Sequence, residues 1–500
     1  MASASSLELP GATRAKSGMC LRVTRLSGLL RAAIWSLPFL GMGYLANRGL
    51  FLSDEHARLL SNTLTVVDRG RAELLGFVYP PLPFFLLFPW PNMVALTVLS
   101  AMAGGYLGQL LWRHLRTLPM PPLARAALLV GALATPASLY VITESLTETL
   151  ALLLLVTSWA NYLAFVREGE TKAGFTAGLS LGAALFVSQY ALLYTAVYVL
   201  LTPRMAAGRG PGLGTSAGLV LIFPVAVSAG AWAYISWAFT GDPVYFLRSA
   251  SPGLLAHAQP HAMDLSPGWR LAMQSTLGDL LASPLYLAIG LMLAALRPIR
   301  LLVFLVPALI ITAVRMLGWA YPDHFAICTY TVTALIAMRP DMPRKLWPLL
   351  MAAAAIHVAV GLTAPMQGEM ARWARAATSG VAGVGDQEEV TIGRHLGQMP
   401  RRSVLADDRI AYRLMARAGT AEPFLLPVDG LYRVAESQPS LFVPYILVPS
   451  KPVPGLDSRV AADFASRPPA GFEPRSSWSE WQLYQGEMRQ GGASLWIGQR

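Results

Sequence analysis

The chain has 500 residues, of which 54% are hydrophobic and 13% are charged. Soluble domains are about one quarter charged, so this composition excludes an ordinary soluble protein and indicates an integral membrane protein. The formal net charge of +11 does not indicate nucleic-acid binding, because the basic residues lie in short loops between apolar runs. Cys20 and Cys328 are far apart in the chain and predict neither a disulfide nor a metal framework.

The first predicted membrane element lies close to the start of the chain. Residues 1–25 are polar and end in a basic cluster, and residues 26–46 form an apolar run long enough to cross a bilayer. A cleavage site of small residues does not follow this run. We therefore predict an uncleaved anchor, with residues 1–25 as a cytoplasmic N-terminal tail.

Further apolar segments predict additional spans, which bring the total to about eleven. The two shortest, 173–187 and 189–202, nearly adjoin. We expect an α-helical polytopic membrane protein with about eleven transmembrane helices. The additional spans are expected at residues 82–112, 123–142, 145–166, 173–187, 189–202, 214–238, 279–296, 299–317, 321–338 and 346–364.

The basic residues predict the orientation of these spans. When the spans are threaded alternately, every loop assigned to the cytoplasm carries at least two basic residues. The outer loops near residues 143, 188 and 319 carry none, which agrees with the positive-inside rule. The loops assigned to the cytoplasm are residues 113–116, 167–172, 203–209, 297–300 and 339–345.

The same threading leaves loops 47–81 and 239–278 and everything after residue 365 on the outer face. We therefore divide the chain into the tail, a transmembrane domain at 26–364 and a soluble C-terminal domain at 365–500. The last part is expected to form a small α/β domain, and it contains no glycine-rich phosphate loop or metal-ligand spacing. Its predicted strands are 404–407, 424–427, 441–448 and 481–484, and its predicted helices are 409–417, 431–436 and 459–466.

The first outer loop concentrates polar residues that are scarce elsewhere. Asp54 and Glu55 precede apolar residues spaced for one helical face, which predicts a short helix on the membrane surface. Acids at a helix start also serve as ordinary caps, so this alternative stays open. A basic cluster with Arg69 and Arg71 follows, and Pro80-Pro81 then stiffens the return of the chain into the next span.

An Asp-Glu pair after the first span, a helix and a Pro-Pro-Leu return resemble the first periplasmic loop of the GT-C superfamily. These membrane glycosyltransferases use polyprenyl-phosphate sugars, and they include protein O-mannosyltransferases and the lipid A aminoarabinose transferase. The resemblance extends to the number of spans and the C-terminal domain. It implies that Asp54 and Glu55 carry the catalytic carboxylate, with Asp54 the better match. Where the lipid A enzymes have a lysine that contacts the donor phosphate, this chain has Tyr79.

The chemistry of such a transfer accounts for these residue types. A polyprenyl phosphate is already a good leaving group, so the reaction needs a base for the acceptor hydroxyl and cations for the phosphate. Asp54 fits the base, and a divalent cation, Mg or Mn, is an open possibility there. Guanidinium groups bind phosphate oxygens in pairs, and the alternative for them is pairing with Asp68 and Glu73. The expected donor-phosphate residues are Arg58, Arg69, Arg71 and Tyr79.

Four further residues on the predicted outer face are expected to bind substrate. Glu144 matches a second acidic position that is common in GT-C enzymes, and ordinary helix-terminal acidity is the alternative. Arg248 follows a Gly-Asp-Pro turn. Arg315 and His324 lie at the outer ends of consecutive spans, where Arg315 and Asp323 could also satisfy each other.

Together these features predict an inner-membrane, or plasma-membrane, glycosyltransferase with its active site outside the cytoplasm. It would transfer a sugar from a polyprenyl-phosphate donor, with inversion, to a glycan, lipid or protein acceptor. Membrane lipids are the other expected partners, and no nucleic acid is expected. The rivals are a transporter or flippase for lipid-linked sugars and a non-catalytic assembly protein. The clustering of acids at one surface, with few ionisable residues inside the spans, favours an enzyme.

Overall fold

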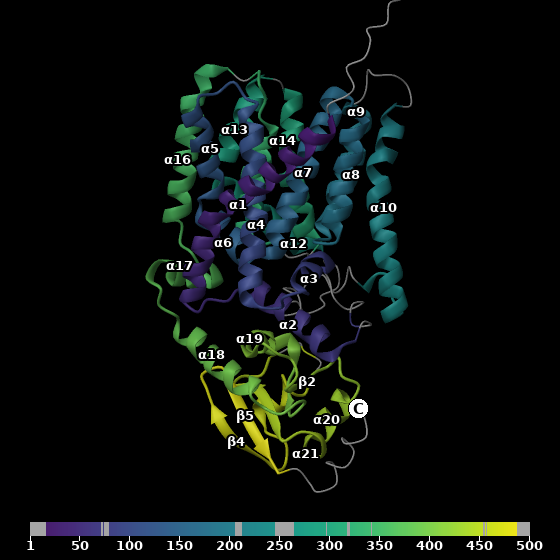
Figure 1. Cartoon of the computed structure of the whole chain (residues 1–500), viewed down its shortest axis with the longest axis vertical. Coiled ribbons are helices and arrows are strands. Elements are labelled where there is room, and N and C mark those ends of the chain that lie inside the picture. The colour runs from purple at the N-terminus through teal and green to yellow at the C-terminus, as the bar shows by residue number, and fades with distance from the viewer. Residues whose placement is uncertain are drawn as a thin grey trace, which may run out of the picture.

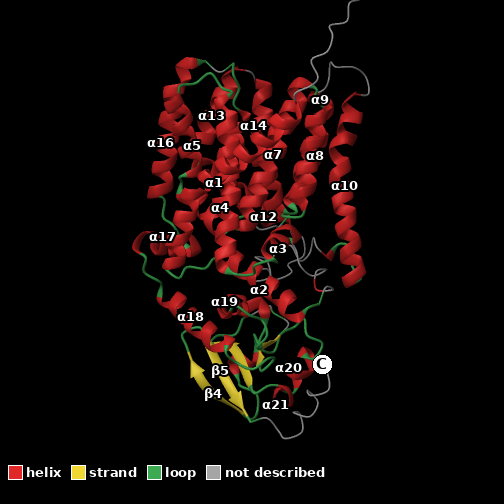
Figure 2. Ribbon diagram, viewed as in Figure 1, coloured by secondary structure: helices red, strands yellow, loops and turns green. Residues whose placement is uncertain are grey.

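A computed structural model describes residues 17–71, 74, 80–205, 213–245, 265–296, 298–317, 321–341, 343–453, 456 and 458–487. A bundle of long helices forms one end of the molecule and a small domain forms the other (Figure 1). All of the strands belong to that small domain (Figure 2). The mostly helical fold and the C-terminal sheet agree with the predicted fold class.

Every predicted span coincides with one helix or with two neighbouring helices. Most of these helices are built from Leu, Ala, Val and Gly, and they bury a common apolar core. The helices of the bundle are α1 (Ser17–Arg48), α4 (Met93–Arg116), α5 (Pro122–Leu133), α6 (Pro136–Glu144), α7 (Leu146–Glu168), α8 (Thr171–Leu185), α9 (Tyr190–Met205), α10 (Leu213–Thr240), α12 (Leu265–Leu281), α13 (Pro284–Leu296), α14 (Pro298–Met316), α15 (Asp323–Ala337) and α16 (Trp347–Thr363), which follows the short 3-10 turn η2 (Arg344–Leu346).

Within the described residues, 4 helices are long and apolar enough to cross a membrane, or up to 6 if each bent pair is one span. The chain is therefore a multi-pass membrane protein, and the number of about eleven crossings stays a prediction. The two bent pairs are α5 with α6, at 65°, and α12 with α13, at 89°. Both bends precede a proline, Pro136 or Pro284, which cannot continue the hydrogen bonding of the preceding helix.

Two predicted span boundaries are wrong. The expected span 82–112 is interrupted, because α3 (Pro81–Leu87) ends before Pro89 and Pro91, and α4 begins only after Asn92. The expected span 279–296 starts inside α12 and turns sharply into α13. In both cases proline ends an apolar helix where hydropathy alone continues.

The predicted helix of the first outer loop is α2 (Asp54–Arg69). Ser53 caps its start by accepting a hydrogen bond from the backbone N–H of His56, and Gly70 ends it in the left-handed conformation. Both faces of α2 are buried, because the helix lies between the bundle and the C-terminal domain (Figure 1). The helix was correctly predicted, and its second covered face is a finding of the structure.

The C-terminal domain is entered through α17 (Gly368–Ser379) and α18 (Val384–Gly397), neither of which was predicted. Its 5-stranded sheet has the order β2-β1-β3-β5-β4. Strand β1 pairs in parallel with β2 and β3, whereas β5 pairs antiparallel with β3 and β4. The other elements are β1 (Val404–Leu405), α19 (Asp408–Ala418), β2 (Phe424–Leu425), α20 (Tyr432–Ser437), α21 (Pro439–Phe442), β3 (Tyr445–Pro449), α22 (Asp463–Ser466), β4 (Phe472–Ser477) and β5 (Trp481–Gly486).

Most of the elements predicted for this domain are present, with three corrections. Residues 441–448 contain the end of α21 before β3, the helix predicted at 459–466 shrinks to α22, and β4 was not predicted. Strand β4 was not predicted because its residues are mostly exposed and lack an alternating apolar pattern.

The two faces of the sheet bury different cores. Leu405, Ile446 and Val448 face a core that belongs to the C-terminal domain alone. Their neighbours Val404 and Leu447 face a second core, which includes Leu residues of α2, α3, α4 and α7. Because successive residues of a strand point to opposite faces, the short strands join the domain to the bundle through α2.

Candidate functional site

The first acid pair lies where α2 begins, at the junction between the bundle and the C-terminal domain. Ser53 fixes this start twice, because its hydroxyl donates to the backbone oxygen of Glu144 at 2.5 Å and accepts from the backbone N–H of His56 at 3.1 Å. Glu144 ends α6, directly before α7. Ser53 is thus the residue that caps the start of α2. The carboxylate of Asp54 is therefore available for other contacts.

The Asp54 carboxylate is held on one side and open on the other. Its Oδ1 atom accepts a hydrogen bond from Nη1 of Arg413 at 2.7 Å, while the side chain remains 45% exposed. Its backbone N–H donates to Oε1 of Glu369 at 2.5 Å. Within the part of the chain that the structure describes, Oδ2 has no hydrogen-bond or ion-pair partner.

Arg413 belongs to α19 of the C-terminal domain and is mostly buried. Its Nε and Nη2 atoms form a two-pronged ion pair with Glu389 at 2.6 and 2.9 Å. Its Nη1 also donates to the backbone oxygen of Leu52 at 2.8 Å, and Nη2 lies 3.4 Å from Asp386. A planar guanidinium with this many fixed partners has a single orientation.

Glu55 occupies a very different environment from that of its neighbour. Its Oε1 accepts a hydrogen bond from the backbone N–H of Thr147 at 3.0 Å, whereas its buried Oε2 has no hydrogen-bond partner among the described residues. Burial is the main cause that raises the pKa of Glu55 to about 7. The acid therefore stays largely protonated in mildly acidic solution and ionises near neutral pH.

His56 is buried beside this acid. Its Nε2 accepts from the backbone N–H of Leu146 at 3.2 Å, so the ring proton resides on Nδ1, which lies 3.9 Å from Oε2 of Glu144. Ser100 lies 3.2 Å from the same Nε2. Burial lowers the pKa of His56 to about 3, and the imidazole is neutral at physiological pH. Its position fits a structural link between α2 and α7.

The structure brings His324 to the same junction. Nε2 of His324 lies 3.4 Å from Oε2 of Glu148, and its ring meets the ring of Tyr140 edge-on at 5.0 Å. Tyr140 also interacts electrostatically with Glu369, which binds the backbone of Asp54. The predicted residues Asp54, Glu55, Glu144 and His324 therefore gather in one region, although they come from α2, α6 and α15.

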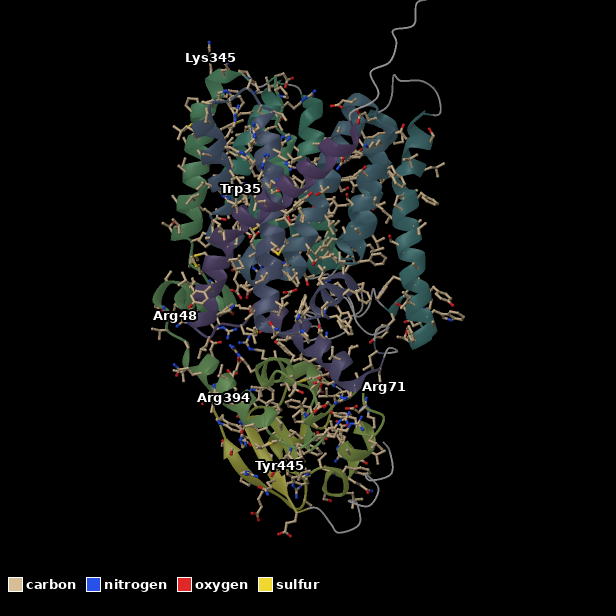
Figure 3. All side chains as sticks on the ribbon, in the orientation of Figure 1. Trp35, Arg48, Arg71, Lys345, Arg394 and Tyr445 are labelled. Atoms are coloured by element: carbon tan, nitrogen blue, oxygen red, sulfur yellow. The ribbon has the colours of Figure 1, made fainter. Side chains whose placement is uncertain are left out.

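The arginines of α2 and its C-terminal end differ in their surroundings. Arg58 lies one helical turn after Asp54 and stacks over the ring of Tyr412, with its guanidinium carbon 4.3 Å from the ring centroid. Arg71 is exposed just after α2 and lies at the level where the bundle meets the C-terminal domain (Figure 3). Both positions are compatible with an anionic ligand.

Arg69 does not have the surroundings expected of a phosphate ligand. Its Nε and Nη2 atoms bind the two oxygens of Asp429 at 2.9 Å each, and further bonds reach the backbone oxygens of Ala421 and Phe424. The side chain is fully buried in this contact. Its position therefore fits docking of the C-terminal domain on α2, and its carboxylate partner is Asp429; Glu73, one of the predicted alternatives, lies outside the described residues.

Arg315 is likewise engaged by protein carboxylates. Its Nη2 atom lies 2.6 Å from Asp279 and 2.9 Å from Asp323, so the suggested pairing with Asp323 is confirmed. The guanidinium joins α12, α14 and α15, and little of it is exposed. These contacts hold the guanidinium in place, and substrate binding by Arg315 stays a prediction.

Two predicted site residues, Tyr79 and Arg248, lie outside the described residues. Among the residues that the structure describes, no group of three or more His, Cys, Asp or Glu could hold a metal ion. Of the carboxylates at this site, Oδ1 of Asp54 is paired with Arg413, and Oε1 of Glu55 accepts from a backbone N–H group. No step is assigned to a metal.

Sequence reasoning missed Arg413 and Glu369, which contact Asp54 from the C-terminal part of the chain. A signal for Arg413 exists, because Arg409, Arg413 and Arg417 recur every four residues and share one face of a predicted helix. Nothing in the sequence indicates that this face meets Asp54, which precedes it by more than 350 residues.

Comparisons with known proteins show the fold. No family model and no curated protein matches the chain. ArnT from Cupriavidus metallidurans bound to undecaprenyl phosphate matches with a TM-score of 0.53 and 11% identity, over 92% of this chain and 98% of that chain. The apo state of the same protein matches with a TM-score of 0.53 and 11% identity, over 93% and 98%. The chain therefore has the ArnT fold, and the predicted GT-C resemblance is confirmed at the level of fold.

Proposed function

We propose that this chain is a membrane glycosyltransferase that transfers a sugar from a polyprenyl-phosphate donor to an acceptor outside the cytoplasm. The fold supports the donor class, because the structure of ArnT that shares it contains undecaprenyl phosphate. The observation that carries the proposal is the Asp54 carboxylate, which is fixed at Oδ1 and open at Oδ2 at the junction of the two domains. A transporter would not require a carboxylate that is fixed at one oxygen and open at the other at this surface.

In the proposed reaction, Oδ2 of Asp54 accepts the proton of the acceptor hydroxyl. The acceptor oxygen forms a bond to the anomeric carbon as the bond from that carbon to the phosphate oxygen breaks, and the polyprenyl phosphate leaves with the bonding electrons. A single displacement of this kind inverts the anomeric centre. The leaving phosphate needs no proton, so one base and a cationic environment for the phosphate are sufficient.

Asp54 is the better catalytic candidate of the acid pair. Glu55 points one oxygen at the start of α7 and buries the other, so its carboxyl group is turned toward the protein. We assign Glu55 a role in holding α2 against α7. Glu144 and His324 remain proposed substrate-binding residues, because contacts through His56, Tyr140 and Glu369 connect them to the start of α2.

The donor phosphate is proposed to bind near Arg58. This guanidinium lies on the same face of α2 as Asp54, since the two residues are four apart in a helix. Arg71 and the predicted residue Tyr79 remain proposed contributors to the phosphate site, and Arg248 remains a proposed substrate-binding residue. Arg69 and Arg315 are not included, because buried carboxylates already satisfy them.

We also propose that the C-terminal domain lies outside the cytoplasm and that the bundle resides in the inner, or plasma, membrane. Lys345, from a basic loop assigned to the cytoplasm, lies at the end of the bundle far from the C-terminal domain (Figure 3). Helix α2, which begins at Asp54, lies at the opposite end of the bundle (Figure 1). The positive-inside rule therefore supports an outer-face position for the site.

The test is transfer of label from a panel of radiolabelled polyprenyl-phosphate sugars in membranes that contain the wild type or Asp54→Ala at matched expression. We expect label in an acceptor only with the wild type. Asp463→Ala is the matched control, because this carboxylate is 67% exposed and lies in the C-terminal domain away from Asp54. Failure of every donor with an inserted, folded wild type would contradict the proposal, and movement of labelled donor across the membrane would then indicate a transporter.

A further inference from the structure

Arg413 links the C-terminal domain directly to the proposed catalytic carboxylate. The residue lies on α19, yet its Nη1 atom donates at 2.7 Å to Oδ1 of Asp54, at the start of α2. The same Nη1 donates at 2.8 Å to the backbone oxygen of Leu52, two residues earlier. One nitrogen of the C-terminal domain therefore holds both the side chain of Asp54 and the backbone that leads into it.

The other edge of the guanidinium is anchored within its own domain. Nε and Nη2 bind the two oxygens of Glu389 at 2.6 and 2.9 Å, from α18. Two parallel hydrogen bonds to a carboxylate fix a guanidinium in its plane. Glu389 thus sets the direction of Nη1, and Nη1 sets the position of Asp54.

The charges around Asp54 show what removal of Arg413 would leave behind. Glu369 binds the backbone N–H of Asp54, and Asp386 and Glu389 lie on the far side of the arginine. Arg372 lies 3.5 Å from Asp386, and Arg58 lies one helical turn after Asp54. Without Arg413, Asp54 would share this region with three like-charged groups, and its carboxylate would turn toward solvent.

We propose that Arg413 is a positioning residue for Asp54 and that the C-terminal domain is therefore part of the catalytic unit. This inference rests on the proposed glycosyl transfer. Arg413 anchors Oδ1 so that Oδ2 faces the acceptor hydroxyl, and it acts on the substrates only through Asp54. Displacement of a reacting group by about 1 Å lowers a rate by about 100-fold, which sets the size of the expected effect.

A docking role alone would make Arg413 equivalent to Arg417, which lies one turn later on the same helix. Nη2 of Arg417 donates to the backbone oxygen of Leu50, so Arg417 also joins α19 to the segment before α2. It has no contact with Asp54 among the described residues. The two arginines therefore separate docking of the domain from positioning of the carboxylate.

The experiment compares Arg413→Ala, Arg413→Lys and Arg417→Ala in the full chain, with Arg394→Ala as a control. Arg394 is exposed on α18 (Figure 3). We expect Arg413→Ala to lower kcat by about 100-fold with little change in KM, and Arg413→Lys to recover part of the loss. Guanidinium at tens of millimolar should restore activity to Arg413→Ala, since the side chain it replaces is 11% exposed. Arg417→Ala should lower the Tm without this selective loss of kcat.

A second measurement does not depend on activity. The Tm of Asp54→Asn, Arg413→Gln and the double variant forms a cycle, and the two single changes should be strongly non-additive if the side chains interact. Additive changes in Tm would overturn the contact. If the wild type is active and the kcat of Arg413→Ala is within threefold of the wild-type kcat, the positioning role is overturned. The proposed function would still stand. A wild type that transfers nothing would remove the proposed function, and the positioning role with it.

Discussion

At the scale of single residues, the structure separates side chains that look equivalent in the sequence. Asp54 and Glu55 are adjacent acids at a helix start, but consecutive helical residues point about 100° apart. Asp54 therefore faces the junction and Arg413, whereas Glu55 faces the start of α7 and is desolvated. The arginines near α2 separate in the same way, because Arg69 points into the C-terminal domain and Arg58 lies on the face of Asp54.

The raised pKa of Glu55 predicts a pH-dependent effect of Glu55→Gln on stability. The pKa rises from the ordinary value of 4.5 to about 7 on folding, so the folded protein binds a proton more tightly than the unfolded chain. This contribution is fully present below about pH 4.5 and is lost as the pH rises through about 7. The amide resembles the protonated acid, so Glu55→Gln should raise the Tm at pH 8 and change it little at pH 5.

Thermal unfolding in detergent at the two pH values checks this prediction. The matched control is Asp463→Asn, because its carboxylate is exposed. An equal Tm difference between Glu55→Gln and the wild type at both pH values would contradict a raised pKa of Glu55.

At the scale of secondary-structure elements, the close approach of helices depends on glycine. A Cβ atom on Gly105 of α4 would lie 2.6 Å from the backbone oxygen of Ala32 and 2.7 Å from the backbone nitrogen of Ser36, both in α1. These are backbone atoms and cannot rotate away. Small residues permit such contacts between membrane helices, so α1 and α4 pack at a distance that larger side chains would forbid.

We therefore expect Gly105→Val to destabilise the bundle by at least about 1–3 kcal/mol, the usual effect of overpacking. Gly41→Val on α1 is the matched control, because a Cβ at Gly41 has nothing within 4 Å. The measurement is the Tm in detergent together with the fraction of protein that elutes as a single species. Equal losses in the two variants would show that helix propensity, and not the contact, is responsible.

The boundaries of the elements depended on single residues, such as proline, whose effect is lost when hydropathy is averaged over a window. The expected spans coincide with helices because long apolar runs satisfy their backbone groups internally in a membrane. Proline still broke three of them, at the residues before α4, at α6 and at α13. In the C-terminal domain, strands with apolar runs were predicted from their residues, whereas β4 carries mostly exposed side chains and was not.

At the scale of the whole molecule, α2 belongs to both domains. Its residues Leu60 and Leu64 share a core with Val404 and Leu447 of the sheet, and Arg69 pairs with Asp429 in a buried contact. The predicted domain boundary at residue 365 therefore does not mark a boundary in packing, because the C-terminal domain and the bundle share a core. A motion of this domain would move the start of α2, and with it Asp54.

Loss of the buried ion pair should weaken this attachment. Arg69→Met removes the two-pronged partner of the buried Asp429 and leaves Arg402 3.9 Å away, so we expect a loss of about 3 kcal/mol in the free energy of unfolding. Arg394→Met is the surface control, and the double variant Arg69→Met with Asp429→Leu should recover part of the loss, because it removes both charges. A Tm of Arg69→Met equal to that of the control would contradict a stabilising role.

The shared core also predicts that a fragment of residues 365–487 needs α2 to fold. Without α2, the sheet face that includes Val404 and Leu447 would be exposed to water, and large apolar patches promote aggregation. A peptide of residues 53–71 added in trans should give the fragment a cooperative thermal transition. The same peptide with Leu60→Asp and Leu64→Asp is the control, and a fragment that melts cooperatively without any peptide would overturn the prediction.

The sequence by itself determined that the chain crosses a membrane, where most of its membrane helices lie, and that an acid pair begins a helix after the first span. Those properties follow from hydropathy, charge placement and local capping, which neighbouring residues decide. Only the tertiary structure decided which acid is open, which arginines are already paired, and that Arg413 reaches Asp54. These contacts join residues hundreds of positions apart, and their energies depend on burial and geometry that exist only when α2 is enclosed between the two domains.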